Sequence, residues 1–362
     1  MRLQKDCVYN LPKLILNRFT KPILKDVMTM KKRITMEDVA NLAKVSKSTV
    51  SQYINKRFDY MSEETKMRIQ YAIEQLQYQP NVLARSLKQK KTSTIGVIIA
   101  NILHTFSTQV IRAIEDACHQ KDYHVIVCNS DDNPEKEKKY IEMLRAKQVD
   151  GLIIFPTGEN VEVFQAISKE EYPIVFIDRY VPSLNLDAIL LNNLSASLLA
   201  VEHFKEKGYT KIGFITNMLN RTPRIERMEG FKKALNKSGL PIIEDYIIGV
   251  ESNELKKEVN RILSLPNPPQ ALLASNDTVL MEILKYSKEN KIKIPKDLAV
   301  IGIDNVAFAD FYNPPLTTIN QPAFEMGHKA VNILFKKIEN NNKDYESQVY
   351  RFEPEIIIRE SC

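Results

Sequence analysis

The sequence predicts a small all-α head joined to a two-lobed α/β body with doubly wound parallel sheets. Three observations support this prediction. Short helical patterns fill residues 34–80, and apolar strands alternate with amphipathic helices from residue 94 onward. The second region also has more strands than one parallel sheet usually holds. We expect the chain to pass to the second lobe near AILLNN, residues 188–193.

The composition is that of an ordinary globular protein. The chain has 362 residues, of which 44% are hydrophobic and 27% are charged, enough for two or three domains. No apolar run is long enough to span a membrane, and LPKLIL near the start is too short for a signal-peptide core. We therefore expect a cytoplasmic protein without membrane contact. Its four cysteines lack metal-ligand spacing, so we expect no metal and no cofactor.

The net charge of +6 is divided unevenly along the chain. Residues 1–29 contain 6 basic and 2 acidic residues, and residues 30–94 contain 13 basic and 6 acidic residues. The remainder, residues 95–362, contains 32 basic and 37 acidic residues. A basic head on an acidic body is typical of a nucleic-acid-binding module joined to a second binding domain. Scattered surface lysines are the alternative explanation.

Residues 1–29 form a basic leader without clear periodicity. Met30, followed by three basic residues, would make a natural translation start. We therefore expect the leader to be disordered or to be a wrongly assigned extension. Mass spectrometry of the native N-terminus distinguishes the two, because peptides from residues 6–25 appear only if the leader is translated.

The head, residues 30–80, begins with two helical patterns separated by a short turn. Thr35 and Asp38 have the spacing of a capping box, and Val39, Leu42 and Ala43 follow at helical intervals. The next residues break this period, and a serine at position 46 can cap a second helix over residues 47–54. This arrangement predicts a helix-turn-helix, although any small helical bundle can contain such a pair.

The second helix of a helix-turn-helix lies in the DNA major groove. Its outward residues near the N-terminus are Lys47, Ser48 and Gln52, whose side chains have the reach and hydrogen-bonding groups to read base edges. We expect four more residues of the head to contact DNA: Thr35, Thr49, Asn55 and Tyr60. The sequence therefore predicts sequence-specific binding to double-stranded DNA.

A third helix is predicted after Ser62, which can cap it. We expect its buried side to consist of Met67, Ile69, Ala72, Ile73 and Leu76. Pro80 is expected to end it. The following stretch, NVLARSLKQKK, is too short to hold a helix on its own. We predict that residues 81–93 are a hinge and linker between the head and the body.

Polar residues stand at several strand ends of the predicted body, residues 94–362. Ligands of doubly wound sheets bind beyond the carboxyl ends of the strands, and two facing lobes form a cleft. Asn101 follows the first strand, and Asn276 and Asp304 each follow a strongly apolar strand. Helix capping is the alternative role for polar residues at such positions.

These motifs resemble the lactose-repressor/galactose-repressor (LacI/GalR) family of bacterial transcription regulators. The resemblance lies in TMEDVANLAKVSKSTVSQYIN and MSEETKMRIQYAIEQLQYQPNVLARSL, and it continues in VDGLII, VFIDR, GYTKIGFI, VIGIDN and PPLTTINQP. It covers residues 34–362. SQYIN and YMSEETK are similar to the ketogluconate-utilisation branch. Lys44 replaces the usual glycine of the turn, and Gln52 replaces the usual arginine.

The resemblance implies a periplasmic-binding-protein-like body and a homodimeric repressor of carbohydrate-utilisation genes. Lobe one then covers about residues 94–190 and 321–345, and lobe two covers about residues 191–320 and the C-terminal segment. The family places its minor-groove wedge at Leu87, and we expect Asn81, Ala84 and Arg85 to contact DNA beside it. The predicted effector-binding residues are Asn101, Phe106, Ser107, Arg227, Asn276 and Asp304. Ser107 stands where the family often has a second aromatic residue.

The predicted effector is a sugar or sugar acid bound between the lobes, because Arg227 can clamp a carboxylate, a phosphate or vicinal hydroxyls. An enzyme is not expected, because the sequence has no glycine-rich phosphate loop, nucleophile elbow or metal-ligand cluster. Two alternatives remain. One is a global catabolite regulator controlled by a phosphocarrier protein, and the other is a sugar-binding protein of a transport system.

Overall fold

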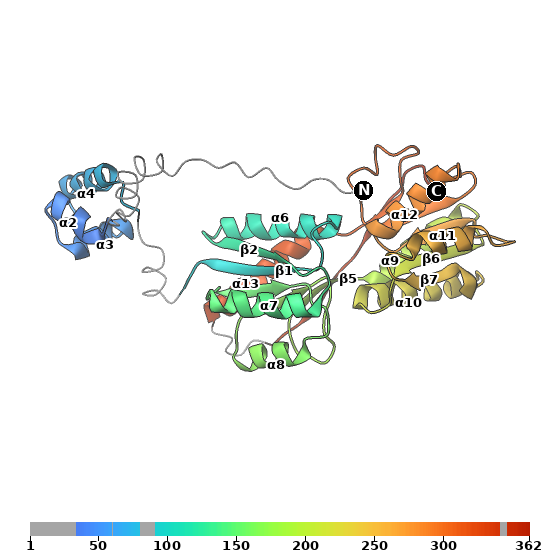
Figure 1. The fold of residues 1–362 in the computed structure, drawn as a ribbon, viewed down its shortest axis with the longest axis horizontal. Helices are drawn as coiled ribbons and strands as arrows, with labels where there is room; N and C mark the ends of the chain where they lie inside the picture. The colour runs from blue at the N-terminus through green and yellow to red at the C-terminus, as the bar shows by residue number, and fades with distance from the viewer. Residues whose placement is uncertain (1–33, 60, 80–90, 341–345) are drawn as a thin grey trace, which may run out of the picture. The chain divides into compact units, whose positions relative to one another are not determined.

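The computed structural model describes residues 34–59, 61–79, 91–340 and 346–362. The chain forms two compact units, Met1–Arg85 and Ser86–Cys362 (Figure 1). The first unit contains the helical head, and the second contains the α/β body. In the described part of the chain, no helix combines the length and the apolar character needed to span a bilayer.

The three helices predicted for the head are confirmed. They are α2 (Met36–Ala43), α3 (Lys47–Ile54) and α4 (Glu63–Leu76). Thr35 and Asp38 form the predicted capping box, and Ser46 accepts a hydrogen bond from the Thr49 backbone N–H. Helix α4 ends at Leu76, earlier than the predicted stop at Pro80, because Gln77 adopts the left-handed conformation with φ 46°.

The core of the head is small and differs in part from the predicted one. Its buried residues are Val39, Ala40, Ala43, Val50, Ile69, Ala72 and Tyr78. One prediction was wrong, because Met67, expected on the buried side of α4, is 64% exposed. Leu42 of α2 is likewise 47% exposed. Both residues lie at the edge of an apolar stripe, where helical spacing alone does not decide which side chain reaches the core.

Lys44, between α2 and α3, has φ 55° and ψ 46°. A non-glycine residue in this left-handed conformation costs about 1 kcal/mol or more. We expect Lys44→Gly to stabilise the head by about 1 kcal/mol and Gln70→Gly, an exposed site inside α4, to destabilise it by a similar amount. Urea titration of operator binding measures both changes, and a Lys44→Gly head that is no more stable contradicts the expected strain.

The body contains two six-stranded sheets, as predicted for a two-lobed α/β body. Sheet one has the order β11-β5-β4-β3-β1-β2 and is entirely parallel. Its strands are β1 (Thr94–Ile99), β2 (His124–Asn129), β3 (Gly151–Ile154), β4 (Ile174–Ile177), β5 (Ala188–Leu191) and β11 (Val349–Phe352). The helices of this lobe are α6 (Thr105–His119), α7 (Pro134–Ala146), α8 (Val161–Lys169) and α13 (Ala323–Asn340).

Sheet two has the order β12-β10-β9-β8-β6-β7, with only β12 antiparallel to its neighbour. Its strands are β6 (Ile212–Asn217), β7 (Ile247–Val250), β8 (Ala271–Ala274), β9 (Ala299–Ile303), β10 (Thr318–Asn320) and β12 (Glu355–Ile357). The helices of this lobe are α9 (Asn193–Glu206), α10 (Thr222–Ser238), the 3₁₀ turn η1 (Glu244–Tyr246), α11 (Leu255–Leu263) and α12 (Asp277–Glu289).

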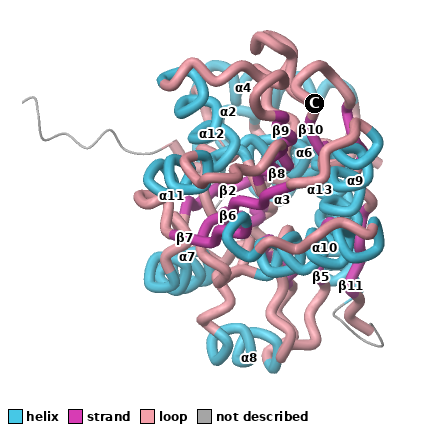
Figure 2. The backbone as a smooth tube through the Cα atoms, turned by 90° about the vertical axis from the view of Figure 1, so that its right-hand side faces the viewer, coloured by secondary structure: helices cyan, strands magenta, loops and turns pink. Residues whose placement is uncertain are grey.

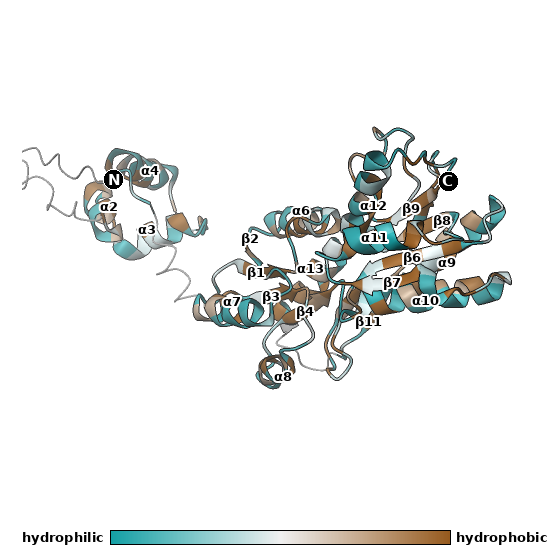
Figure 3. Cartoon of the chain, turned by 45° about the vertical axis from the view of Figure 1, so that its right-hand side comes forward, coloured by the Kyte–Doolittle hydropathy of each residue, from teal (hydrophilic) through white to brown (hydrophobic). Residues whose placement is uncertain are grey.

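The chain passes between the lobes three times. The passages follow β5, β10 and β11, so β11 extends the second segment of lobe one to Phe352. Helices cover both faces of each sheet: α6 and α13 pack opposite α7 and α8 in lobe one, and α9 and α10 pack opposite α11 and α12 in lobe two (Figure 2). The strands are correspondingly apolar, while the helices carry hydrophilic residues on their outer sides (Figure 3).

Gly230 lets α9 and α10 pack closely in lobe two. A Cβ atom at this position would lie 2.8 Å from the Leu194 Cα and 2.9 Å from the Leu194 carbonyl oxygen, both backbone atoms that cannot rotate away. The absence of a side chain therefore fixes how near α10 lies to α9. The N-cap and the first two turns of α10 carry three arginines toward the cleft, so this packing also positions the candidate site.

Candidate functional site

The N-terminal part of α3 presents the three side chains predicted to read DNA bases. Lys47, Ser48 and Gln52 are exposed, and the Lys47 Nζ lies 3.7 Å from a carboxylate oxygen of Glu37. The Ser48 hydroxyl lies 2.7 Å from that of Ser46, which caps the helix. An exposed helix start with polar side chains, held by a packed helix behind it, is suited to enter a DNA groove.

The remaining residues predicted to contact DNA have local roles or lie outside the described residues. Thr35 belongs to the capping box of α2, and Thr49 shares a hydrogen bond with the Ser46 hydroxyl. The Asn55 side chain donates to the Ser51 carbonyl. Five predicted residues lie outside the described part of the chain: Tyr60, Asn81, Ala84, Arg85 and Leu87.

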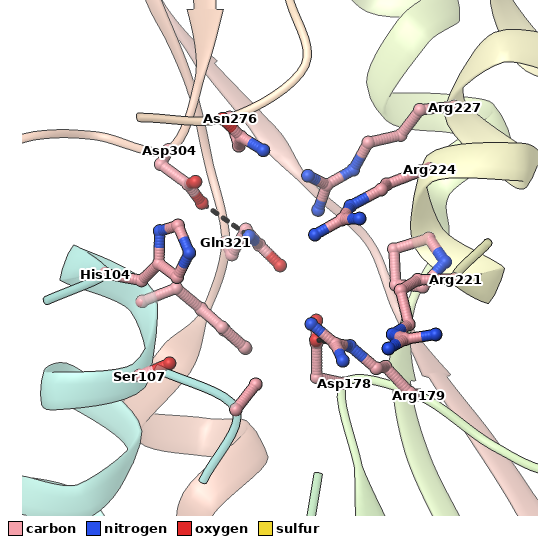
Figure 4. Close-up of a pocket in the computed structure, with 13 residues that line it drawn as sticks. His104, Ser107, Asp178, Arg179, Arg221, Arg224, Arg227, Asn276, Asp304 and Gln321 are labelled. Carbon is pink, nitrogen blue, oxygen red and sulfur yellow. Dashed lines mark hydrogen bonds and ion pairs between the residues drawn. The ribbon is translucent and has the colours of Figure 1, made fainter. Parts of the chain in front are cut away.

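A cavity lies between the two lobes at the carboxyl ends of the strands (Figure 4). It is lined by Ala100, His104, Phe106, Ser107, Asp178, Arg179, Arg221, Pro223, Arg224, Arg227, Asn276, Asp304 and Gln321. Five of the six predicted effector residues are brought together here. The sixth, Asn101, is not among the lining residues, and its side-chain oxygen accepts a hydrogen bond from the Leu103 backbone N–H instead.

Arg227 is held rigidly in the wall of the cavity. It is 5% exposed, its Nε donates to the Asn193 side-chain oxygen at 2.8 Å, and its Nη1 donates to the Ser275 carbonyl at 2.6 Å. These two bonds orient a planar guanidinium whose partners are both uncharged. The positive charge of this guanidinium acts on the nearby Asp304 and can also act on an incoming acceptor.

Asp304 faces the same cavity from the end of β9. It is 6% exposed, has φ 92°, and accepts hydrogen bonds from the Gln321 side chain at 2.5 Å and the Asp277 backbone N–H at 3.3 Å. Burial raises the pKa of Asp304 to about 6, although the charge of Arg227 acts in the opposite direction. A buried carboxyl with a pKa near neutrality can donate or accept a hydrogen bond.

Asn276 combines the two roles considered for strand-end residues. Its side-chain oxygen caps α12 by accepting from the Val279 backbone N–H, and its amide donates to the Asn217 side-chain oxygen at 2.8 Å. It nevertheless lines the cavity. Helix capping therefore fixes the side chain of Asn276 at the edge of the site.

Several lining residues were not among those predicted. His104, Asp178 and Arg179 follow strands β1 and β4, and Arg221 and Arg224 surround the start of α10. Position at a strand end is the signal that points to the first three. Gln321 follows β10, a three-residue strand whose short sequence gives little indication that it belongs to a sheet.

His104 and Asp277 connect the two lobes at one side of the cavity. The His104 Nδ1 lies 2.6 Å from the Asp277 Oδ1, and the Thr105 backbone N–H donates to the other carboxylate oxygen at 2.9 Å. Burial alone lowers the pKa of His104, but the hydrogen bond and the charge of Asp277 outweigh it and raise the pKa above its ordinary value. Asp304 and Asp132 act in the same direction.

This bridge predicts a pH-dependent stability. Because the pKa of His104 is raised in the folded chain, its stabilising contribution is complete below the ordinary histidine pKa of about 6.5 and is lost as the pH rises through the folded value. We expect wild type to exceed His104→Gln in melting temperature by more at pH 6 than at pH 8.5. His119→Gln, at an exposed histidine of α6, is the control. An equal difference at both pH values contradicts the bridge.

The described residues contain no group of three or more histidine, cysteine, aspartate or glutamate side chains placed to hold a metal ion. The lining of the cavity instead offers hydrogen-bond donors and acceptors, among them arginine guanidinium groups and aspartate carboxyl groups. This chemistry fits reversible binding of a small polar molecule.

Comparison with known proteins gives matches in both units. The family described as "Bacterial regulatory proteins, lacI family" matches residues 35–81, and the "Periplasmic binding protein-like domain" matches residues 201–362. The chain is 48% identical over 332 residues to the "Probable HTH-type transcriptional regulator EndR" of Paenibacillus polymyxa, covering 90% of this chain and 98% of that protein.

Two further relatives extend this result. The chain is 34% identical over 330 residues to the "HTH-type transcriptional repressor PurR" of Aliivibrio salmonicida, covering 90% of this chain and 98% of that protein. The solved structure of the Lac repressor bound to ONPG in the repressed state is similar in fold, with a TM-score of 0.81 and 24% identity. That match covers 91% of this chain and 100% of the other.

Proposed function

Because this chain belongs to the LacI family and is a DNA-binding transcriptional repressor of that type, we propose that it controls carbohydrate-utilisation genes through a sugar or sugar-acid effector bound between the two lobes. It is a regulator and not an enzyme. LacI-type repressors bind operator DNA and a small-molecule effector and act as dimers. A homodimer places two heads on the two half-sites of a near-palindromic operator.

The arginines of the cavity are the observation that supports an acidic effector. Four guanidinium groups line it, those of Arg179, Arg221, Arg224 and Arg227, against the carboxyl groups of only two aspartates. Guanidinium groups form paired, charge-assisted hydrogen bonds with carboxylates and phosphates. Their number therefore favours an acidic effector over a neutral sugar.

The other lining residues suit the hydroxyl groups of a sugar. The amides of Asn276 and Gln321 supply neutral donors and acceptors, and Asp304 supplies a carboxyl group. The ring of Phe106, packed edge-on against Phe155 with centroids 6.3 Å apart, adds an apolar wall. A few oriented polar groups with an apolar surface form the usual lining of a small-molecule site.

The proposal is tested by the effect of sugar acids on operator binding. Duplexes selected by the wild-type chain from a random library supply the operator, and fluorescence anisotropy measures its affinity. We expect a sugar acid such as gluconate or galacturonate to change operator affinity at least about tenfold, and glucose and galactose to have no comparable effect. A neutral sugar that alone changes the affinity would replace the acidic effector, and no response to any of these ligands contradicts the proposal.

In the proposed DNA complex, α3 reads the major groove with Lys47, Ser48 and Gln52. Glutamine pairs best with adenine and arginine with guanine. We expect Gln52→Arg to change the preferred base pair at one position of each half-site from A·T to G·C, with a discrimination of about 1–3 kcal/mol per position. Selection from a random library shows this directly. Identical operators for wild type and variant would remove Gln52 from the base-reading set.

The entry of the chain into lobe one suggests how the body is coupled to the head. The backbone N–H groups of Thr92 and Ser93 both donate to the carboxylate of Asp150 at 2.8 Å, just before β3. These two hydrogen bonds attach the end of the linker to sheet one, at the residue before β3. A change in how the lobes meet then reaches the proposed hinge and biases the heads toward or away from DNA.

A further inference from the structure

The carboxylate of Asp132 lies where three arginine side chains of the cavity wall converge. Arg179 bonds it through Nη1, and the Arg224 Nη2 lies 3.3 Å and the Arg221 Nε 3.7 Å from its oxygens. The Arg221 Nη2 also donates to the Asp132 carbonyl at 3.0 Å. One carboxylate thus serves three guanidinium groups that line the effector cavity.

The backbone directs this carboxylate toward the arginines. Asp131 and Asp132 both adopt positive φ angles, 53° and 57°, immediately after β2. The Asp132 backbone N–H is fixed by the Ala100 carbonyl at 2.9 Å. Consecutive left-handed residues are costly unless the surroundings hold them in place. Here the two side chains have different partners: Asp131 pairs with Lys136, and Asp132 pairs with the arginines.

All three arginines share Asp132, and Arg221 has a second carboxylate nearby in Glu159, whose Oε1 lies 3.4 Å from its Nη1. Although burial acts to raise it, the three arginines lower the pKa of Asp132 to about 2. Burial and the neighbouring Arg179 and Arg221 together lower the pKa of Arg224 to about 10. Arg179 has a second partner in Asp178, with its Nε 3.2 Å from that carboxylate. A further anion would relieve the repulsion among the three guanidinium groups.

We propose that Asp132 is an internal counter-ion that competes with an acidic group of the effector for Arg179, Arg221 and Arg224. The inference rests on the proposed acidic effector and adds how that site selects it. Asp132 is part of lobe one, whereas Arg221 and Arg224 belong to lobe two, so this carboxylate also bridges the two lobes. An effector must then supply a stronger or better-placed negative charge than Asp132, which excludes neutral sugars and weakly held anions.

Sulfate binding to Asp132→Asn tests the competition with a defined anion. Asparagine tolerates the left-handed conformation and keeps the shape of the side chain, so the loop is retained. Asp131→Asn is the matched control. It removes the same charge at the neighbouring position, where the Asp131 side chain is 49% exposed. Calorimetry of the full chains, at constant ionic strength maintained with sodium chloride, gives the sulfate dissociation constants.

We expect sulfate to bind Asp132→Asn at least about tenfold more tightly than wild type, and Asp131→Asn to stay within about twofold of wild type. Adding Arg224→Ala to Asp132→Asn should remove most of the gain. Circular dichroism verifies that each variant is folded. Sulfate affinity that is unchanged or weaker in folded Asp132→Asn would overturn the proposal, as would an equal gain in Asp131→Asn.

The same variants separate this inference from the proposed function. If sulfate binds Asp132→Asn more tightly but no sugar acid changes operator binding, the counter-ion is supported and the acidic effector is not. If a sugar acid controls operator binding but neither it nor sulfate binds Asp132→Asn more tightly, the effector stands and the counter-ion is wrong.

Discussion

Replacement of Ile69 by alanine is expected to abolish operator binding while the body remains folded. Ile69 is fully buried in α4 and contacts a core of only a few residues. Removing a buried isoleucine to alanine costs about 2–5 kcal/mol. A domain as small as this head buries too little surface to have a large reserve of stability. The loss is therefore comparable to the whole free energy of unfolding of the head.

Operator affinity and the unfolding of the body are measured on the same Ile69→Ala chain. The body, residues 91–340 and 346–362 of the described chain, has its own hydrophobic clusters, so its thermal transition should stay within about 1 °C of wild type. Met67→Ala is the matched control, because Met67 lies on the same helix with 64% exposure. Its operator affinity should be nearly that of wild type. Normal operator binding by Ile69→Ala would show that the head tolerates the cavity.

The head shows what the sequence could predict, its helix caps, and what it could not, the burial of Ile69 rather than Met67. The caps at Thr35, Ser46 and Ser62 depend on local spacing, and all three form as expected. Met67 and Ile69 are both apolar and close on the helix, yet only Ile69 faces α2 and α3. The choice depends on where the other helices lie, and this is a tertiary property that helical periodicity does not contain.

The body follows the same division between local and long-range information. The apolar runs expected from residue 94 onward form the strands β1 to β9, most of which are buried segments with turn residues at their ends, whereas the edge strands β2 and β7 are only partly buried. The edge strand β11 has alternating exposed and half-buried residues and pairs with β5, far away in the sequence. Its existence depends on that pairing. The formation of β10 likewise depends on its pairing with β9. The position of Gln321 in the cavity lining follows from that pairing, because Gln321 comes directly after β10.

The candidate site was only partly predictable for a related reason. The rule that ligands bind at the carboxyl ends of parallel strands led to Asn276 and Asp304, which both line the cavity. The rule does not show that Asp132 reaches across to arginines of the other lobe. That contact requires two lobes in a defined arrangement and a backbone in an uncommon conformation. Neither is visible in a run of residue types.

Removal of Arg227 is expected to have the largest effect on effector binding. Arg227→Ala takes away a guanidinium that is already oriented by Asn193 and Ser275, so no ordering cost compensates for its loss. It also leaves Asp304 buried without the nearby positive charge that lowers its pKa. Losing a desolvated charge partner costs about 2–5 kcal/mol, which corresponds to about 30-fold or more in effector affinity.

Arg227→Lys separates charge from shape in this prediction. Lysine keeps the positive charge but cannot donate to Asn193, Ser275 and a ligand in one plane, so we expect it to recover less than half of the lost binding free energy. Arg112→Ala, at a 68% exposed arginine of α6 paired with Asp116, is the control and should bind effector as wild type does. Calorimetry with the sugar acid that alters operator binding gives the affinities. Unchanged affinity in Arg227→Ala would remove this residue from the effector site, whereas full recovery by lysine would show that charge alone is recognised and that the rigid orientation of the guanidinium has no part in it.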